Sequence, residues 1–219
     1  MMKLSSYYGN PYIGVYCAAS EGVSFIPVDS PRTLARDIEE ALGVEVVRCN
    51  IASTNLLGAL LAMNSHGAVI TSMASKEEKE FIAGRLPVYV IEDRLNASGN
   101  NILANDKGAL VNPDIGKKVL KKIEQTLRVE VVQGTIAGHK TVGSVCAATN
   151  RGVLCHPAAS DEDLELLRSV LKVPTAIGTL NYGTPLVGAC MVANSRGAAV
   201  GFRSTPIELG RVEDGLSLI

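Results

Sequence analysis

The side chains most able to do chemistry in this chain are five cysteines and three histidines. Covalent catalysis by cysteine needs a neighbouring base, usually a histidine that an acidic residue orients. A zinc site needs cysteine or histidine ligands in closely spaced pairs. The cysteines are odd in number and form no C-x-x-C pair, which favours reduced thiols over a disulfide framework or a metal site. The cysteines are residues 17, 49, 146, 155 and 190, and the histidines are residues 66, 139 and 156.

A pattern of paired glycines recurs five times and indicates the elements that must position these residues. In each unit a glycine, an apolar run, a polar turn and a second glycine follow in order, and the two glycines are eight or nine residues apart. The second glycines are spaced by 45, 41, 44 and 45 residues, which indicates a repeat architecture. The first glycines are Gly14, Gly58, Gly99, Gly143 and Gly188, and the second are Gly22, Gly67, Gly108, Gly152 and Gly197.

The turn before the second glycine predicts a hairpin in each unit. It reads Asn-Asp-Lys-Gly at 105–108 and Asn-Ser-Arg-Gly at 194–197. Asparagine and glycine tolerate a positive φ, which tight hairpin turns require. The apolar segments on both sides, such as 57–63 and 68–70, are typical of short strands.

Helix-start signals follow the hairpins. Ser30 precedes a proline, which predicts an N-cap. Ser75 and Glu78 have capping-box spacing, and Ser160 precedes an acidic first turn. A third strand comes after the helix, so each unit reads strand, strand, helix, strand. These third strands are predicted at 44–47, 87–91, 129–132 and 173–177.

The fifth unit has a predicted helix at 206–215 but no clear third strand after it. In the other units the third strand is centred 11 or 12 residues before the next first glycine. Counting 12 residues back from Gly14 gives Met2, so residues 2–5 are predicted to complete the fifth unit and close the ring. We expect one α/β domain over 1–219, with repeats at about 9–50, 51–94, 95–136, 137–180 and 181–219.

The composition indicates a folded protein without broad affinity for nucleic acid. Hydrophobic residues make up 47% of the chain and charged residues 20%, so a sizeable core can form. The formal net charge of −1 argues against a protein wrapped around nucleic acid. No signal peptide is evident, and no apolar run approaches the roughly 18 residues of a membrane span. We therefore expect a cytoplasmic location.

Five such units in about 220 residues resemble the pentein fold, a five-fold pseudosymmetric β/α propeller. Over essentially its whole length the chain also resembles the translation initiation factor 6 family, and its end soon after the fifth unit is similar to the short archaeal form. The segments that carry this resemblance are 10–14 (NPYIG), 64–70 (NSHGAVI), 92–100 (EDRLNASGN), 171–174 (LKVP) and 178–183 (GTLNYG).

The resemblance implies a protein that acts by binding and not as an enzyme. Members of this family dock on the large ribosomal subunit, near an L14-type ribosomal protein and the sarcin–ricin loop. They prevent the small subunit from joining and take part in late maturation of the large subunit. The resemblance therefore implies a monomeric anti-association factor with no cofactor, no metal and no binding to membranes or free nucleic acid.

A guanidine-modifying hydrolase with a cysteine nucleophile, as in some pentein proteins, is the alternative function. Cys17 and Cys146 each lie three residues after a first glycine, where the other units have leucine, isoleucine and methionine. Cys155 lies three residues after a second glycine, where the other units have apolar residues. Thiols that alternate with apolar side chains are predicted to be core residues. His66 occupies a polar turn and is predicted to be solvated, and no catalytic residues are predicted.

Equivalent positions in a ring lie at the same end of it. The residues that directly follow the first glycines should therefore share one end, and we take this end as the ribosome-binding face, with the opposite end as the alternative. Asn100 and Asn101 replace mostly apolar residues, so they either bind the partner or face a hydrated central channel. The candidate binding residues are Val15, Ala59, Gly99, Asn100, Ser144 and Ala189.

Two further groups of residues have two interpretations each. Five tyrosines gather near the predicted junction of units five and one, where they either pack the junction or contribute to an interface. Four lysines within 117–122 lie on the polar face of a predicted helix, where they are either solvated or in contact with ribosomal RNA phosphates. The tyrosines are Tyr7, Tyr8, Tyr12, Tyr16 and Tyr182, and the lysines are Lys117, Lys118, Lys121 and Lys122.

Overall fold

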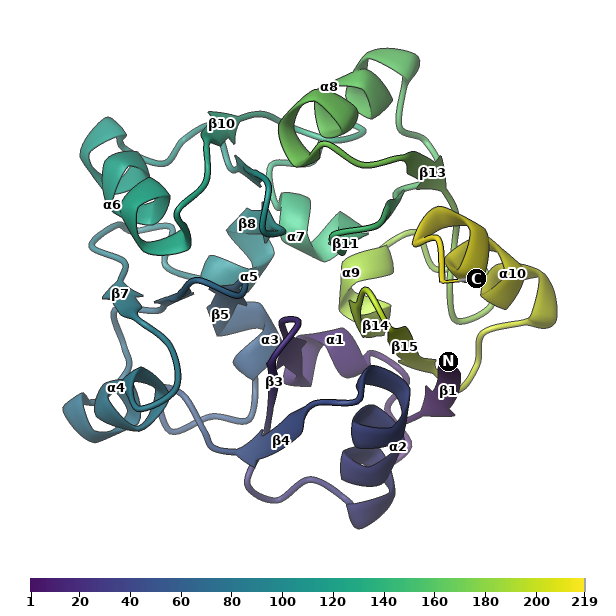
Figure 1. Ribbon diagram of the computed structural model, residues 1–219, viewed down its shortest axis with the longest axis horizontal. Helices are drawn as coiled ribbons and strands as arrows, with labels where there is room; N and C mark the ends of the chain where they lie inside the picture. The colour runs from purple at the N-terminus through teal and green to yellow at the C-terminus, as the bar shows by residue number, and fades with distance from the viewer. Residues whose placement is uncertain (219) are drawn as a thin grey trace.

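The computed structural model describes residues 1–218, and within them five three-stranded sheets surround a central axis as the blades of a ring (Figure 1). This arrangement confirms the predicted five-fold β/α propeller. From blade one to blade five, the sheets are β2 (Ala18–Ala19), β3 (Val23–Ile26) and β4 (Glu45–Arg48); β5 (Leu61–Met63), β6 (Ala68–Ile70) and β7 (Val88–Val90); β8 (Ile102–Ala104), β9 (Ala109–Val111) and β10 (Val131–Gln133); β11 (Cys146–Ala148), β12 (Val153–Cys155) and β13 (Thr175–Ile177); and β14 (Met191–Asn194), β15 (Gly197–Gly201) and β1 (Met2–Ser5).

The fifth blade takes its third strand from the N-terminus of the chain. In every blade the middle strand runs antiparallel to the first strand and parallel to the third. Strand β1 pairs in parallel with β15, and Met2 lies opposite Ala198. Met2 is the residue that the glycine spacing predicts for this position. The first strand of the chain therefore belongs to the last blade, as Figure 1 shows.

An outer helix covers each blade at the rim of the ring (Figure 1). The capping boxes predicted at Ser75 and Ser160 are present, and Thr205 forms a third one. The cap predicted at Ser30 is wrong, because the helix begins at Arg32 without a side-chain cap, and the Ser30 hydroxyl is buried without a partner among residues 1–218. The outer helices are α2 (Arg32–Leu42), α4 (Lys76–Ala83), α6 (Lys117–Leu127), α8 (Asp161–Leu171) and α10 (Pro206–Gly215).

A second set of helices, each of a single turn, lies around the axis just before the first strand of each blade. Their positions correct the prediction that 57–63 is a continuous strand. Each first glycine sits in one of these helices, and a Cβ added to Gly58 would collide with the carbonyl oxygen of Gly14 in the preceding blade. Only glycine permits this approach, which recurs around the whole ring. These short helices are α1 (Ile13–Tyr16), α3 (Leu57–Leu60), α5 (Ser98–Asn101), α7 (Val142–Val145) and α9 (Val187–Cys190).

The hairpin turns join neighbouring blades by side-chain hydrogen bonds. The prediction of positive φ in these turns is wrong, because their asparagines and glycines are absent from the residues with positive φ in the described chain. Instead, Asn105 Nδ2 donates to the carbonyls of Thr149 and Leu171 in the next blade, both at 2.9 Å. Its Oδ1 accepts from the N–H groups of Lys107 and Gly108. Asn64 Nδ2 likewise donates to two carbonyls of the next blade, and Asn194 Nδ2 donates to one, that of Leu42. We call these three asparagines the blade clamps.

Blade one differs from the others in its hairpin. The turn closes by a bond from Ser20 N to Val23 O, so Val23 takes the place that glycine holds elsewhere. This difference explains why Gly14 and Gly22 are eight residues apart and not nine. It also moves the alignment of blade one with the other blades by one residue, so that Cys155 corresponds to Ile26.

Candidate functional site

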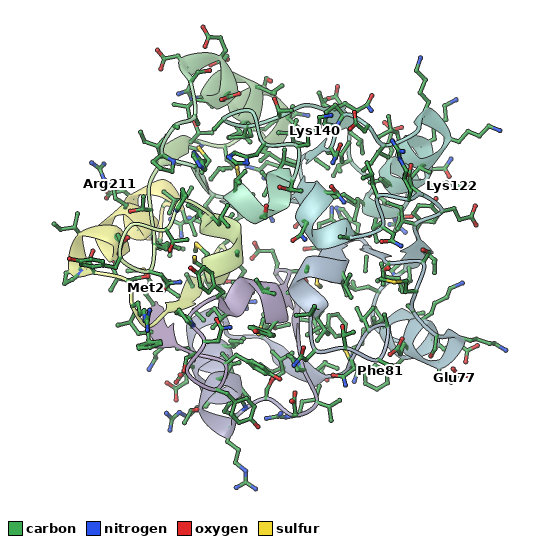
Figure 2. The ribbon with its side chains drawn as sticks, turned by 180° about the vertical axis from the view of Figure 1, so that it is seen from behind. Met2, Glu77, Phe81, Lys122, Lys140 and Arg211 are labelled. Atoms are coloured by element: carbon green, nitrogen blue, oxygen red, sulfur yellow. The ribbon has the colours of Figure 1, made fainter. Side chains whose placement is uncertain are left out.

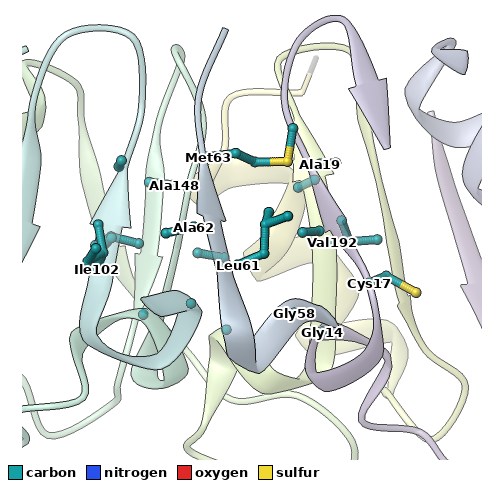
Figure 3. Close-up of a pocket in the computed structure, with 18 of the residues that line it drawn as sticks. Gly14, Cys17, Ala19, Gly58, Leu61, Ala62, Met63, Ile102, Ala148 and Val192 are labelled. Atoms are coloured by element: carbon teal, nitrogen blue, oxygen red, sulfur yellow. The ribbon is translucent and has the colours of Figure 1, made fainter. Parts of the chain in front are cut away.

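The two ends of the ring have different structures. The middle and third strands of each blade run toward one end of the ring. The outer helices begin at this end and the short helices lie there, so we call it the short-helix end. The hairpin turns lie at the other end, which we call the turn end. Figure 3 shows Gly14 and Gly58 at the base of the strands and Ala19 and Met63 near the hairpins.

The predicted binding residues come together at the short-helix end. Val15, Ala59, Asn100, Ser144 and Ala189 are each the third residue of a short helix, and all are partly exposed. The short helices contact one another in sequence, including α9 with α1, so these side chains form a closed circle. Gly99 has a structural reason to be glycine, because an added Cβ would collide with the carbonyl oxygen of Gly58.

The two adjacent asparagines of blade three have different environments. Asn101 is buried, donates to the carbonyls of Leu95 and Ala97, and accepts from Asn112 Nδ2 at 2.8 Å. Asn100 is partly exposed, and its side-chain amide has no hydrogen bond within residues 1–218. The lining of the central channel contains neither amide, so the interpretation that both amides face this channel is wrong.

An apolar rim accompanies this circle, and only its tyrosine was singled out from the sequence. Tyr12, Leu56 and Leu186 each directly precede a short helix, and each is 37% exposed. The equivalent residues in blades three and four are alanine and threonine. The rim therefore exposes large apolar side chains over blades five, one and two. Over blades three and four its side chains are smaller. A signal was present, because these residues lie two positions before a first glycine.

Left-handed turns brace the short-helix end. Ala52 and Ser53 both have positive φ, which is uncommon for residues with a Cβ. Glu78, from the capping box of α4, accepts hydrogen bonds from the N–H groups of Ala52 (2.9 Å) and Ser53 (3.0 Å). Burial alone would raise the pKa of Glu78, but the backbone N–H groups outweigh it and hold the pKa below its ordinary value of 4.5. Asp163 and Glu208 bind the corresponding turns of blades four and five.

The tyrosines divide between packing and exposure. Tyr7 is buried, its ring stacks on Tyr16 with centroids 4.1 Å apart, and its hydroxyl donates to Asp29 at 2.7 Å. The interpretation as packing is therefore confirmed for these two residues. Tyr8, Tyr12 and Tyr182 are exposed, and they remain available to an interface.

The central channel is a space of about 120 Å³ lined by glycines and by small or apolar side chains. The five first glycines and side chains of the first strands line it, as Figure 3 shows for Leu61, Ile102 and Val192. Its lining includes Cys17 and Cys146, and among the described residues it includes no histidine or carboxylate. A thiol in the channel thus lacks the base that a nucleophile needs.

The cysteines have the properties of core residues. All five are buried, as predicted for Cys17, Cys146 and Cys155. Burial raises the pKa of Cys49 and Cys190 to about 12, and it also raises the pKa of Cys17 and Cys146. Reactive cysteines have lowered pKa values and partial exposure. The environment of these thiols therefore gives no support to a cysteine hydrolase.

The histidines are distributed between two places. His66 is half-buried in its hairpin turn, where its backbone N–H donates to Asn64 Oδ1. His139 and His156 lie together in blade four, with ring centroids 5.0 Å apart. Burial and then the neighbouring His139 lower the pKa of His156. Within the described chain, no group of three or more histidine, cysteine or acidic side chains could hold a metal ion.

Polar groups at the turn end bind one another across the blades. Ser65 donates from its N–H and its hydroxyl to Asp106, at 2.8 and 2.7 Å, and Asn150 Nδ2 donates to the same carboxylate. Ser195 binds Glu21 in the same way. The polar groups of this end are therefore largely used within the ring, in contrast to the free amide of Asn100.

Comparison with known proteins identifies the family of this chain. Curated relatives named Translation initiation factor 6 include those of Haloquadratum walsbyi (41% identical, covering 100% of this chain and 97% of the relative), Picrophilus torridus (40%, covering 99% and 100%) and Methanocaldococcus jannaschii (40%, covering 100% and 99%). Among solved structures, a dimethylarginine dimethylaminohydrolase has a TM-score of 0.45 and 12% identity, covering 94% of this chain and 74% of its own, a likeness too remote to support an inference.

No helix of the described chain is both long and apolar enough to cross a membrane.

The model of the eIF-6 family matches residues 2–215, nearly the whole chain. Together with the relatives named for translation initiation, this match shows that the chain belongs to the eIF-6 family of translation initiation factors, which are not enzymes.

Proposed function

We propose that this protein binds the large ribosomal subunit through its short-helix end and thereby prevents the small subunit from joining. Membership of a family of translation initiation factors supports a role at this stage. The observation that carries the finer proposal is the composition of the short-helix end. A partly apolar rim surrounds small side chains there, and the amide of Asn100 is unpartnered within residues 1–218.

The apolar rim suits a protein partner. Tyr12, Leu56 and Leu186 expose apolar surface around a circle of small residues, so a partner can approach the backbone of the short helices closely. Aromatic anchors at the centre of an interface contribute most of its binding energy. Of the two partners that the family resemblance implies, we therefore propose that the L14-type ribosomal protein binds this face and that the sarcin–ricin loop lies beside it. The turn end is the poorer candidate, because its polar groups bind one another.

The ring is built to bind without rearrangement. Glycine contacts fix the short helices against each other, and the blade clamps fix the hairpins. A preorganised surface loses little conformational entropy on binding. An interface of roughly 800 Å² on each partner could then give nanomolar affinity, about 12 kcal/mol, without any chemistry. The turn end would stand where the small subunit docks, and release at the end of subunit maturation would restore joining.

Co-sedimentation with purified large subunits tests this proposal. Asn100→Arg or Ala59→Arg places a long cation in the circle and should abolish co-sedimentation, and small subunits should then join again. Gly22→Arg is the matched control, because this glycine is exposed at the turn end and an added Cβ there meets open space. Folding is checked for each variant by circular dichroism. Unchanged binding of both short-helix variants, or loss of binding only in Gly22→Arg, would reject the assigned face.

A further inference from the structure

Helix α6 carries four exposed lysines that no described carboxylate pairs with. Lys117, Lys118, Lys121 and Lys122 are all exposed, and none of them belongs to an ion pair within residues 1–218. Figure 2 shows Lys122 pointing away from its blade at the rim of the ring. The helix has one acidic residue, Glu124, so it is strongly basic in a chain of net charge −1.

The positions of these lysines lower the stability of helix α6. Lys117 and Lys118 occupy the first turn, where the helix dipole favours acidic residues. Lys117 and Lys121, like Lys118 and Lys122, are also like charges four residues apart, which repel each other. Helices α4, α8 and α10 instead carry acidic residues in the first turn. Features that disagree with local stability are expected at functional sites.

The apolar face of α6 is already used in the core. Val119, Ile123 and Leu127 are buried, and Leu120 is half-buried. A helix that binds a lipid surface needs its apolar face free for insertion, so a membrane is a poor partner. Lysine ammonium groups act as point charges, which suit phosphate groups spaced along a chain without selecting bases. Phosphate contacts of this kind position a protein on nucleic acid.

From these observations we propose that the lysine face of α6 binds the phosphodiester backbone of RNA. The inference rests on the proposed function in one respect, namely that the RNA is that of the large ribosomal subunit. Gly116, the N-cap of α6, is bound by Asp93 in the loop that leads to short helix α5, so the lysines of the first turn lie beside the short-helix end. A ring docked by that end would bring this flank toward ribosomal RNA. The net charge of −1 limits the contact to this local face.

Salt-dependent binding to a short RNA duplex tests the face directly. If all four lysines contact phosphates, the affinity should fall roughly 100-fold between 50 and 200 mM salt, and the double variant Lys118→Gln/Lys122→Gln should fall only about tenfold over the same range. The matched control is Lys76→Gln/Lys79→Gln on α4, where both lysines are exposed and flanked by acidic residues. It should behave as the wild type, and thermal melts should show the α6 variant to be at least as stable as wild type.

Three outcomes would overturn the assignment to RNA. The first is no binding of the wild type to the duplex at 50 mM salt. The second is that the α4 control loses as much salt dependence as the α6 variant. The third is that the wild type binds a poly-glutamate chain or anionic phosphatidylserine vesicles as tightly as it binds the duplex. Co-sedimentation with large subunits separates this inference from the proposed function. If wild type binds subunits but the α6 variant keeps the same salt dependence, only the inference fails. If wild type binds the duplex through α6 but does not bind subunits, the proposed function fails together with the assignment of the RNA to the large subunit, and the lysine face remains an RNA-binding face.

Discussion

Replacing Asn105 by threonine should weaken the ring at the joint between blades three and four. Asn105 is buried and forms four hydrogen bonds, two donated across the joint and two accepted within its own turn. Blade four has Thr149 at the equivalent position, and its hydroxyl accepts from the N–H groups of Arg151 and Gly152. A threonine at 105 should therefore keep the two accepted bonds and lose the two bonds across the joint.

The expected magnitude follows from these bonds. Each protein hydrogen bond contributes about 0.5–1.5 kcal/mol, and a buried group left unpaired costs about 1–3 kcal/mol. Loss of the two donated bonds leaves the carbonyls of Thr149 and Leu171 without this partner, so Asn105→Thr should destabilise by about 1–3 kcal/mol. Asn105→Ala also removes the acceptor of the turn and should cost about 3–5 kcal/mol. For a chain of this size the melting temperature falls by roughly 2–4 °C per kcal/mol.

Urea unfolding followed by circular dichroism measures both variants, and Asn100→Thr is the control. Asn100 is an asparagine whose side chain forms no hydrogen bond within the described residues, so the same substitution should change stability by less than about 0.5 kcal/mol. The reasoning would be refuted if Asn105→Thr were no more destabilising than this control. It would also be refuted if the threonine and alanine variants at 105 were equally unstable.

Two further predictions concern glycine packing and pH. Gly99→Ala should destabilise by about 1–3 kcal/mol or more, because its Cβ would meet the Gly58 carbonyl, whereas Gly22→Ala should be nearly neutral; similar melting temperatures for the two would contradict this. The pKa of Glu78 is lowered on folding. The ionised carboxylate therefore stabilises the folded protein fully above pH 4.5, its ordinary pKa, and this contribution is lost as the pH falls through the folded pKa. Glu78→Gln should therefore be less stable than wild type at pH 7, and urea titrations should show the difference shrinking below pH 4.5; a difference independent of pH would contradict this.

Local signals in the sequence were sufficient for the order and closure of the blades. Capping at Ser75 and Ser160 depends on residues three positions apart, and the place of β1 follows from counting back from Gly14. The cap at Ser30 failed because a serine before proline has no capping partner when the helix starts at Arg32. Such local patterns predict which elements exist more reliably than where each one begins.

Contacts between blades could not be read from one unit alone. The turn glycines were assigned to positive φ, but Gly67 and Gly108 are glycine because an added Cβ would collide with helix carbonyls of the next blade. Positive φ occurs instead at Ala52 and Ser53, which carry no glycine or asparagine signal and depend on Glu78. The leucines of the apolar rim were missed because Leu56 and Leu186 resemble core residues in apolar segments. Their exposure depends on the position of the short helices.

The repeats themselves help to separate residues that the ring needs from residues that are free to bind. A requirement of the five-fold packing must be met in every blade, as the first glycines are, with each one against the carbonyl of its neighbour. The residue that follows each of these glycines obeys no such requirement, and it varies between valine, alanine, asparagine and serine. In the same way, α6 has lysines where α4, α8 and α10 have acidic first turns. Because the ring closes equally well without these departures in its other blades, packing does not explain them, and Asn100 and the α6 lysines are the first places to look for contacts with a partner.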